Sequence, residues 1–193
     1  MQILTTPHPF LKHKAKPLGA WDKKTAKEVA QMAEILKHTV NPKGVGLAAT
    51  QVGLDKRLFI LLDEEKQTTK VFVNPEVIST SQKMLSSVYK KKKDRWFEGC
   101  LSIPKIWGFV DRPYQITVVF DTLVPSTKIG EGGTATAGGE VLTTVTEEFS
   151  DVSSAYIQHE IDHLNGILFT DRIIEQKGQI LCETENGLSP ITL

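Results

Sequence analysis

The sequence predicts an α+β fold in which antiparallel β-sheets pack around a central helix, with an amphipathic helix nearer the N-terminus. Stretches of β-branched and aromatic residues precede the central helix and do not alternate with helices along the chain. Apolar residues recur at helical spacing in residues 22–39. The central helix is predicted to contain the motif at residues 158–166, with His159-Glu160-Ile161-Asp162-His163.

The N-terminal third is expected to form an irregular segment followed by one helix. Prolines at positions 7, 9 and 17 keep the first segment extended. Asp22 is suited to cap the helix, and Asn41-Pro42 ends it. The glycines and alanines of residues 44–53 let the backbone approach another strand or a ligand closely. A phosphate-binding loop is excluded there, because neither G-x-G-x-x-G nor a following Gly-Lys-Ser/Thr is present.

The middle of the chain is predicted to be mostly strands. Four stretches have the β-branched and aromatic content of strands: 57–62, 70–78, 115–120 and 140–147. Residues 79–94 are polar and predict a long excursion, and the glycine-rich tip at residues 130–139 is expected to be mobile. Ser150 or Asp151 is suited to cap the following helix, which ends near Asn165-Gly166.

Length and composition are those of one ordinary globular domain. The chain has 193 residues, 40% of them apolar and 24% charged, and its formal net charge is zero. Residues 1–175 are expected to form a single domain, and residues 176–193 a tail that is a strand or disordered. No signal peptide or run of about 18 apolar residues occurs, and two cysteines are too few for a disulfide framework. We therefore expect a cytoplasmic protein.

The pair His159 and His163 indicates a metal site. Residues four apart lie one turn from each other on the same face of a helix, so the two imidazoles can bind one metal ion. Glu160 lies about 100° further round the helix, where its carboxylate can reach a metal-bound water. This is the H-E-x-x-H arrangement of metal-assisted hydrolases. An ordinary helix with two surface histidines is the alternative.

A catalytic metal of the zinc type needs a third protein ligand. Asp162 points elsewhere on the helix and is expected to be solvated or hydrogen-bonded. No histidine follows Gly166, so the downstream candidates are acids: Asp171, Glu175, Glu183 and Glu185. Upstream stands Cys100, for which the ordinary interpretation is a small buried hydrophobic residue.

Three segments together resemble the motifs of the peptide deformylase family, in the family's order. They are Gly44-Val45-Gly46-Leu47-Ala48-Ala49-Thr50-Gln51, Glu98-Gly99-Cys100-Leu101-Ser102 and Gln158-His159-Glu160-Ile161-Asp162-His163-Leu164-Asn165-Gly166. The resemblance runs from the N-terminus to about residue 171. It implies that the chain removes the formyl group from the N-terminal formyl-methionine of newly made proteins and releases formate.

The resemblance also implies a role for each motif residue. Cys100, His159 and His163 would be the ligands of one divalent metal ion, most often Fe²⁺ in this family, with Zn²⁺, Ni²⁺ or Co²⁺ as alternatives. Ligand type alone would favour zinc. Glu160 would be the general acid/base for a metal-bound water that attacks the formyl carbon. Gln51 and the backbone N–H of Leu101 would stabilise the oxyanion.

We expect the methionine side chain to bind in a pocket built from all three motifs and their neighbours. Its predicted lining residues are Val45, Gly46, Trp96, Glu98, Gly99, Val152, Ala155 and Tyr156. Plain core packing is the alternative for Val45 and Val152. Glu98 is expected to pair with Arg112 and so to fix the turn that carries Cys100; the alternative is a surface ion pair that contributes nothing measurable.

Formyl-methionyl nascent peptides are the expected partners, and no specific nucleic-acid recognition or membrane binding is predicted. A transient ribosome contact is possible, but residues 176–193 lack the helical pattern with which many bacterial members meet the ribosome. Two rival functions remain: a metallopeptidase that cuts internal peptide bonds, and a metal-binding or peptide-binding module without turnover. A pure binder would need neither Glu160 nor Gln51.

Overall fold

The computed structural model describes residues 1–39, 43–63, 65–91, 96–125, 134–135 and 140–191. Its helices are η1 (Pro9–Lys12), α1 (Lys23–His38), η2 (Ala49–Val52), α2 (Leu85–Val88), α3 (Val152–Leu164) and α4 (Phe169–Glu175). Its strands are β1 (Gly46–Ala48), β2 (Leu58–Asp63), β3 (Thr68–Thr80), β4 (Glu98–Cys100), β5 (Ile103–Gly108), β6 (Gln115–Pro125), β7 (Thr134–Ala135), β8 (Glu140–Ser150), β9 (Ile180–Thr184) and β10 (Gly187–Pro190). The α+β class predicted from the sequence is confirmed.

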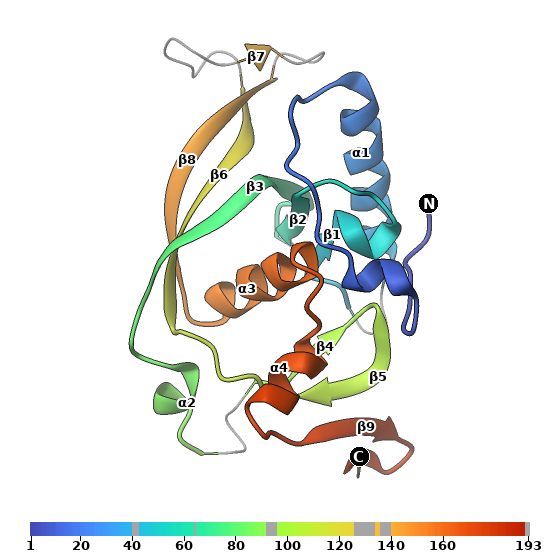
Figure 1. Ribbon diagram of the computed structural model, residues 1–193, viewed down its shortest axis with the longest axis vertical. Helices are drawn as coiled ribbons and strands as arrows, with labels where there is room; N and C mark the ends of the chain where they lie inside the picture. Colours follow the sequence, from blue (N-terminus) through green and yellow to red (C-terminus); the bar gives the residue numbers. More distant parts are fainter. Residues whose placement is uncertain (40–42, 64, 92–95, 126–133, 136–139, 192–193) are drawn as a thin grey trace.

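The strands form two antiparallel sheets. The larger sheet has the order β1-β2-β3-β6-β8-β7 and the smaller one the order β10-β9-β5-β4. Strands β6 and β8 make the long, twisted hairpin that rises beside α1 (Figure 1), with Gln115 opposite Ser150 at one end and Pro125 opposite Glu140 at the other. The strand β1 is at an edge of the larger sheet, and β4 is at an edge of the smaller one. These two edge strands carry the glycine-rich motif and the cysteine motif.

Helix α3 runs through the middle of the molecule (Figure 1). Its apolar side chains Ile157, Ile161 and Leu164 belong to one core cluster with the stacked rings of Phe59 and Phe72 from the larger sheet. Because α3 is covered on more than one side, most of its polar residues are buried as well. His159, Glu160, Asp162 and His163 are all less than 9% exposed.

The extended N-terminal segment ties the three motifs together. The backbone N–H of Leu4 donates to the carbonyl of Gln51 at 2.8 Å, and that of Thr6 donates to the carbonyl of Ser102 at 2.9 Å. Further along, the N–H of Ala15 donates to the carbonyl of Leu164 at the end of α3, at 2.9 Å. These backbone bonds hold segments that are far apart in the sequence in one fixed arrangement.

The two helix caps predicted from the sequence have different outcomes. Asp22 caps α1, since its carboxylate accepts the N–H of Thr25 at 2.7 Å. Asp151 occupies the N-cap position of α3 but makes no capping hydrogen bond. The predicted position is confirmed, but the Asp151 carboxylate accepts the hydroxyl of Tyr89, which follows α2, in place of a helix N–H.

The predicted glycine-rich tip, the excursion at 79–94 and the C-terminal tail have different outcomes. The glycine-rich tip at 130–139 lies outside the described residues, apart from strand β7. The excursion at 79–94 begins as the end of β3 and then forms α2, while its last three residues also lie outside the described part. In the tail, β9 pairs with β5 and β10 pairs with β9.

None of the helices in the described part has the length and apolar character needed to span a bilayer.

Candidate metal centre

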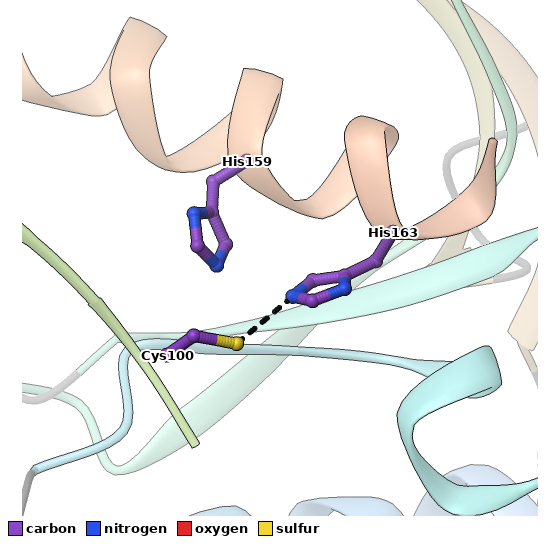
Figure 2. Close-up of side chains that lie close together, drawn as sticks. All are labelled: Cys100, His159 and His163. Carbon is purple, nitrogen blue, oxygen red and sulfur yellow. Dashed lines mark hydrogen bonds between the residues drawn. The ribbon is translucent and has the colours of Figure 1, made fainter. Parts of the chain in front are cut away.

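Cys100, His159 and His163 form a buried cluster. One ligand atom from each residue can be chosen so that all of them lie within 4.8 Å of one another. Cys100 ends β4, and α3 presents the two imidazoles toward its thiol (Figure 2). The Nε2 atom of His163 lies 3.1 Å from the Sγ atom of Cys100. The structure therefore brings the cysteine of one motif to the two histidines of another.

A hydrogen bond to Glu98 fixes the ring of His159. The Nδ1 atom of His159 lies 2.8 Å from Oε2 of Glu98, so Nε2 is the ring nitrogen left for a metal. Burial raises the pKa of Glu98, but the Arg112 guanidinium outweighs burial and lowers that pKa to about 2. Glu98 is therefore a carboxylate that accepts the Nδ1 proton of His159.

The three residues fit a divalent transition metal. A thiolate and two imidazoles are the ligand types that zinc and iron accept, and three protein ligands leave a coordination position open for chemistry. Burial lowers the pKa of His163 well below its usual value, and the charges of His159 and Arg112 lower it further. A neutral imidazole is the form that binds a metal.

Glu160 lies next to the cluster, and one of its carboxyl oxygens has no hydrogen-bond partner in the described structure. This atom, Oε2, is buried. Burial raises the pKa of Glu160 to about 7, although the charge of His159 acts in the opposite direction. A carboxyl group that titrates near neutrality is suited to accept and return a proton.

The side chain of Gln51 directs its amide nitrogen toward the cysteine. Its Oε1 atom accepts the backbone N–H of Ala48 at 2.9 Å, which fixes which end of the amide is the donor. The Nε2 atom then lies 3.1 Å from Oγ of Ser102 and 3.5 Å from Sγ of Cys100. Gln51 is 2% exposed, so this donor is held in a dry environment.

A cavity of about 160 Å³ opens beside the cluster. The rings of Trp96 and Tyr156 meet edge to face in its wall, with their centroids 5.0 Å apart. The residues predicted for the site that line this cavity are Val45, Gly46, Gln51, Trp96, Gly99, Cys100, Leu101, Tyr156, His159 and Glu160.

Three residues predicted for the cavity wall do not line it. Glu98 lies behind His159, where it pairs with Arg112, while Val152 and Ala155 are also absent from the lining. The structure adds four lining residues that the sequence analysis did not propose: Lys43, Gly44, Phe97 and Trp107. Trp107 could have been found only from the strand register, because it pairs with Gly99 across β4 and β5.

The ion pair predicted between Glu98 and Arg112 is present and buried. The Nη2 atom of Arg112 donates to Oε2 of Glu98 at 2.9 Å, and Nε donates to Oε1. Asp162 is not solvated: it is 6% exposed and accepts hydrogen bonds from Arg112 and Arg172. Of the downstream acids, Asp171 instead accepts the N–H of Leu168.

Comparisons with known proteins agree on one family. The model of the family described as polypeptide deformylase matches residues 1–130 and 136–179 of this chain. The peptide deformylase of Borreliella burgdorferi is 35% identical over 171 residues, which are 89% of this chain and 86% of the relative. That of Halothermothrix orenii is 36% identical over 174 residues, which are 90% of this chain and 94% of the relative.

Solved structures give the same result. The crystal structure of peptide deformylase from Thermotoga maritima superposes with a TM-score of 0.68 at 29% identity, covering 89% of this chain and 95% of that one. A peptide deformylase from Synechococcus elongatus, solved in complex with actinonin, superposes with a TM-score of 0.68 at 27% identity. It covers 89% of this chain and 78% of that one.

Proposed function

This chain belongs to the peptide deformylase family, and we propose that it removes the formyl group from the N-terminal formyl-methionine of newly synthesised proteins, releasing formate. The observation that carries this proposal is the meeting of Cys100, His159 and His163 beside Glu160 at one cavity. Two ordinary surface histidines would be exposed, whereas these are buried and face a thiol.

The proposed ligand atoms are Sγ of Cys100, Nε2 of His159 and Nε2 of His163. They would hold one divalent ion, with Fe²⁺ as our first choice and Zn²⁺, Ni²⁺ or Co²⁺ as alternatives that the same donors accept. A divalent ion bound there supplies Lewis acidity, which in the most effective sites lowers the pKa of water to about 7. Glu98 supports this arrangement by holding the His159 ring through Nδ1.

Glu160 would move the proton during hydrolysis. Its unpartnered Oε2 atom is free to accept a proton from the attacking water and later to give that proton to the departing amine. Burial raises the pKa of this carboxyl group above its ordinary value, which favours proton uptake by Glu160. General acid–base catalysis of this kind contributes about 10²–10⁴ in rate.

The oxyanion that forms at the formyl carbon needs donors fixed in advance. We assign this role to Nε2 of Gln51, whose orientation is set by Ala48, and to the backbone N–H of Leu101, which lines the same cavity. Each such donor typically contributes about 10²–10³ in rate. Hydrogen bonds are strong in this buried setting because water does not compete for the donor.

The cavity would bind the methionine side chain against Trp96 and Tyr156. A thioether contacts aromatic rings favourably, which suits these two residues as its walls. The substrate class implies action where proteins are synthesised, and therefore a cytoplasmic location. Residues 180–190 form a hairpin, so this segment does not supply a helix for contact with the ribosome.

The test of this proposal separates formyl removal from peptide cleavage. Formyl-methionyl and unformylated forms of one short peptide would be incubated with metal-loaded protein and analysed by mass spectrometry. We expect loss of the formyl group from the first peptide and no change in the second. Internal cleavage of either peptide would favour a metallopeptidase instead, and no reaction with a fully loaded site would favour a binding module.

A further inference from the structure

Arg172 lies in α4, outside the cavity that holds the metal cluster. Its side chain is 33% exposed and belongs to a second cavity, of about 470 Å³, which Arg112 and Asp162 also line. None of these three residues lines the cavity beside Cys100. Arg172 nevertheless is the outer end of a chain of hydrogen bonds that reaches a metal ligand.

This series of hydrogen bonds begins with a two-point contact between Arg172 and Asp162. Nη2 of Arg172 donates to Oδ1 of Asp162 at 2.7 Å, and Nε donates to Oδ2 at 3.2 Å. The same Oδ2 atom accepts Nη1 of Arg112 at 2.8 Å. The carboxylate of Asp162 is therefore shared between two guanidinium groups, and both of its oxygens are in use.

The inner half of the chain ends at His159. The guanidinium of Arg112 donates to both oxygens of Glu98, and Oε2 of Glu98 also faces Nδ1 of His159 at 2.8 Å. The inner side chains are almost inaccessible, with 5% of Arg112, 1% of Glu98 and 8% of Asp162 exposed. Water therefore does not readily replace a partner that one of these groups loses.

The charges of these four hydrogen-bonded side chains alternate in sign and cancel. Arg172 and Arg112 are cations, and Asp162 and Glu98 are anions, so the four groups together are neutral. Without Arg172, the Asp162 carboxylate would keep Arg112 as its single cationic partner and would draw that guanidinium toward itself. Because the same guanidinium holds Glu98, the position of Glu98 behind His159 would shift as well.

We propose that Arg172 is a positioning residue for the metal centre, acting through Asp162, Arg112 and Glu98 on the orientation of the His159 ring. This inference rests on the proposed metal site but not on the proposed reaction. Loss of a group that directly contacts a metal-binding histidine typically lowers metal affinity by about 10–100-fold. Arg172 lies three contacts further away, so its loss should have a smaller effect of the same kind.

The test follows the release of cobalt from protein loaded with Co²⁺. Cobalt bound to a thiolate absorbs light in bands that report its ligand geometry, and transfer of the metal to an excess of chelator gives a release rate. In Arg172→Gln we expect altered absorption bands and a release rate raised several-fold, below the ~10–100-fold range of a direct partner. Neither readout requires a peptide substrate, so failure of the proposed reaction would not affect this test.

Glu175→Gln is the matched control. Glu175 pairs with Nη1 of the same guanidinium at 3.2 Å but makes no contact with Asp162, so its loss should leave the bands and the release rate unchanged. Arg172→Lys keeps the positive charge but not the two-point contact, and an intermediate release rate is expected. This second variant keeps the test decisive if the glutamine variant does not fold.

A purely structural role for Arg172 predicts a different pattern. In that case the metal-free variants would unfold at lower temperature than the metal-free parent, while the cobalt bands and release rates of folded protein would stay unchanged. That result would overturn the proposal. Equal effects of Arg172→Gln and Glu175→Gln would also overturn it, because the contact with Asp162 would then not be the cause.

Discussion

Gly46 and Glu160 lie so close together that a Cβ atom at position 46 would be 2.4 Å from Oε1 of Glu160. Real Cβ atoms do not approach other heavy atoms this closely, so a larger residue at this point of β1 would force the Glu160 carboxylate to move. The same added atom would lie 2.9 Å from Cδ2 of Leu61 on β2, which limits any sideways escape. The glycine-rich motif thus shapes the space that the Glu160 carboxylate occupies.

Gly46→Ala should therefore displace the Glu160 carboxylate. We expect kcat to fall by about 10-fold or more, with the metal content unchanged, because a misplaced proton carrier slows the reaction and not metal binding. Steady-state kinetics together with metal analysis would check this. Gly19→Ala is the control, since an added Cβ there has no neighbour within 4 Å. Unchanged kcat in Gly46→Ala would show that Glu160 does not act from this position.

Gln51→Met should remove an oxyanion donor while keeping a side chain of similar length. We expect kcat to fall by about 10²–10³ and KM to change little, because the donor acts on charge that develops in the transition state. Ser102→Ala is the control: it removes a partner of Gln51 Nε2 but leaves Ala48 holding the amide. A loss that appears in KM alone would assign Gln51 to ground-state binding.

Arg112→Met should destabilise the fold strongly. It would leave the carboxylates of Glu98 and Asp162 without their shared guanidinium in the interior, and breaking a buried ion pair in this way typically costs about 3–5 kcal/mol. Denaturant unfolding at neutral pH measures the free energy of unfolding. Lys66→Met, which removes an exposed ion pair with Asp63, should give no measurable change.

The Tyr89 hydroxyl should titrate unusually late. Its hydrogen bond to Asp151 is the main reason that the pKa of Tyr89 is raised to about 12, from an ordinary value of 10.0. The unfolded chain loses this proton first, so stability from the contact is present below about pH 10 and is lost as the pH rises toward 12. Ultraviolet absorbance of tyrosinate, compared between the parent protein and Tyr89→Phe, would check this. A titration near pH 10 would contradict the contact.

The features most readily predicted from the sequence are those that depend on residue spacing within one helix. His159 and His163 lie four residues apart on one helix, so helix geometry alone predicted that the two imidazoles face the same side and could share a metal. Cys100 followed only from the family resemblance, because its distance from the histidines depends on how the short strand β4 docks against α3. The distance between Cys100 and the histidines cannot be predicted from a local sequence pattern.

The misses in the cavity wall have the same origin. Trp107 was overlooked because the register of β4 and β5 places it beside Gly99, where a Cβ atom would be 2.7 Å from the ring. Ala155 was predicted for the cavity from its direction on α3, yet the structure buries it completely, since α3 is covered on more than one side. The helical pattern predicts the direction of a side chain but not which residues pack against it.

The C-terminal residues show how partner strands decide structure. Residues 176–193 contain glycine and proline and lack a helical pattern, so a strand and a disordered tail were both possible from the sequence. Backbone pairing between β9 and β5 places them in the smaller sheet, with Ile106 opposite Cys182. The edge that β5 offers is a property of the folded molecule and cannot be recognised from the tail itself.

The most direct measurement of the central claim is formate release by Glu160→Gln. Parent and variant would be purified without air and loaded in parallel with Fe²⁺ or Zn²⁺, and their metal content would be determined before assay with a formyl-methionyl peptide. We predict equal metal content and a loss of turnover of about 10²–10⁴ in the variant, because glutamine cannot carry the proton. Equal formate release by parent and variant, or none from a fully loaded parent, would contradict the account.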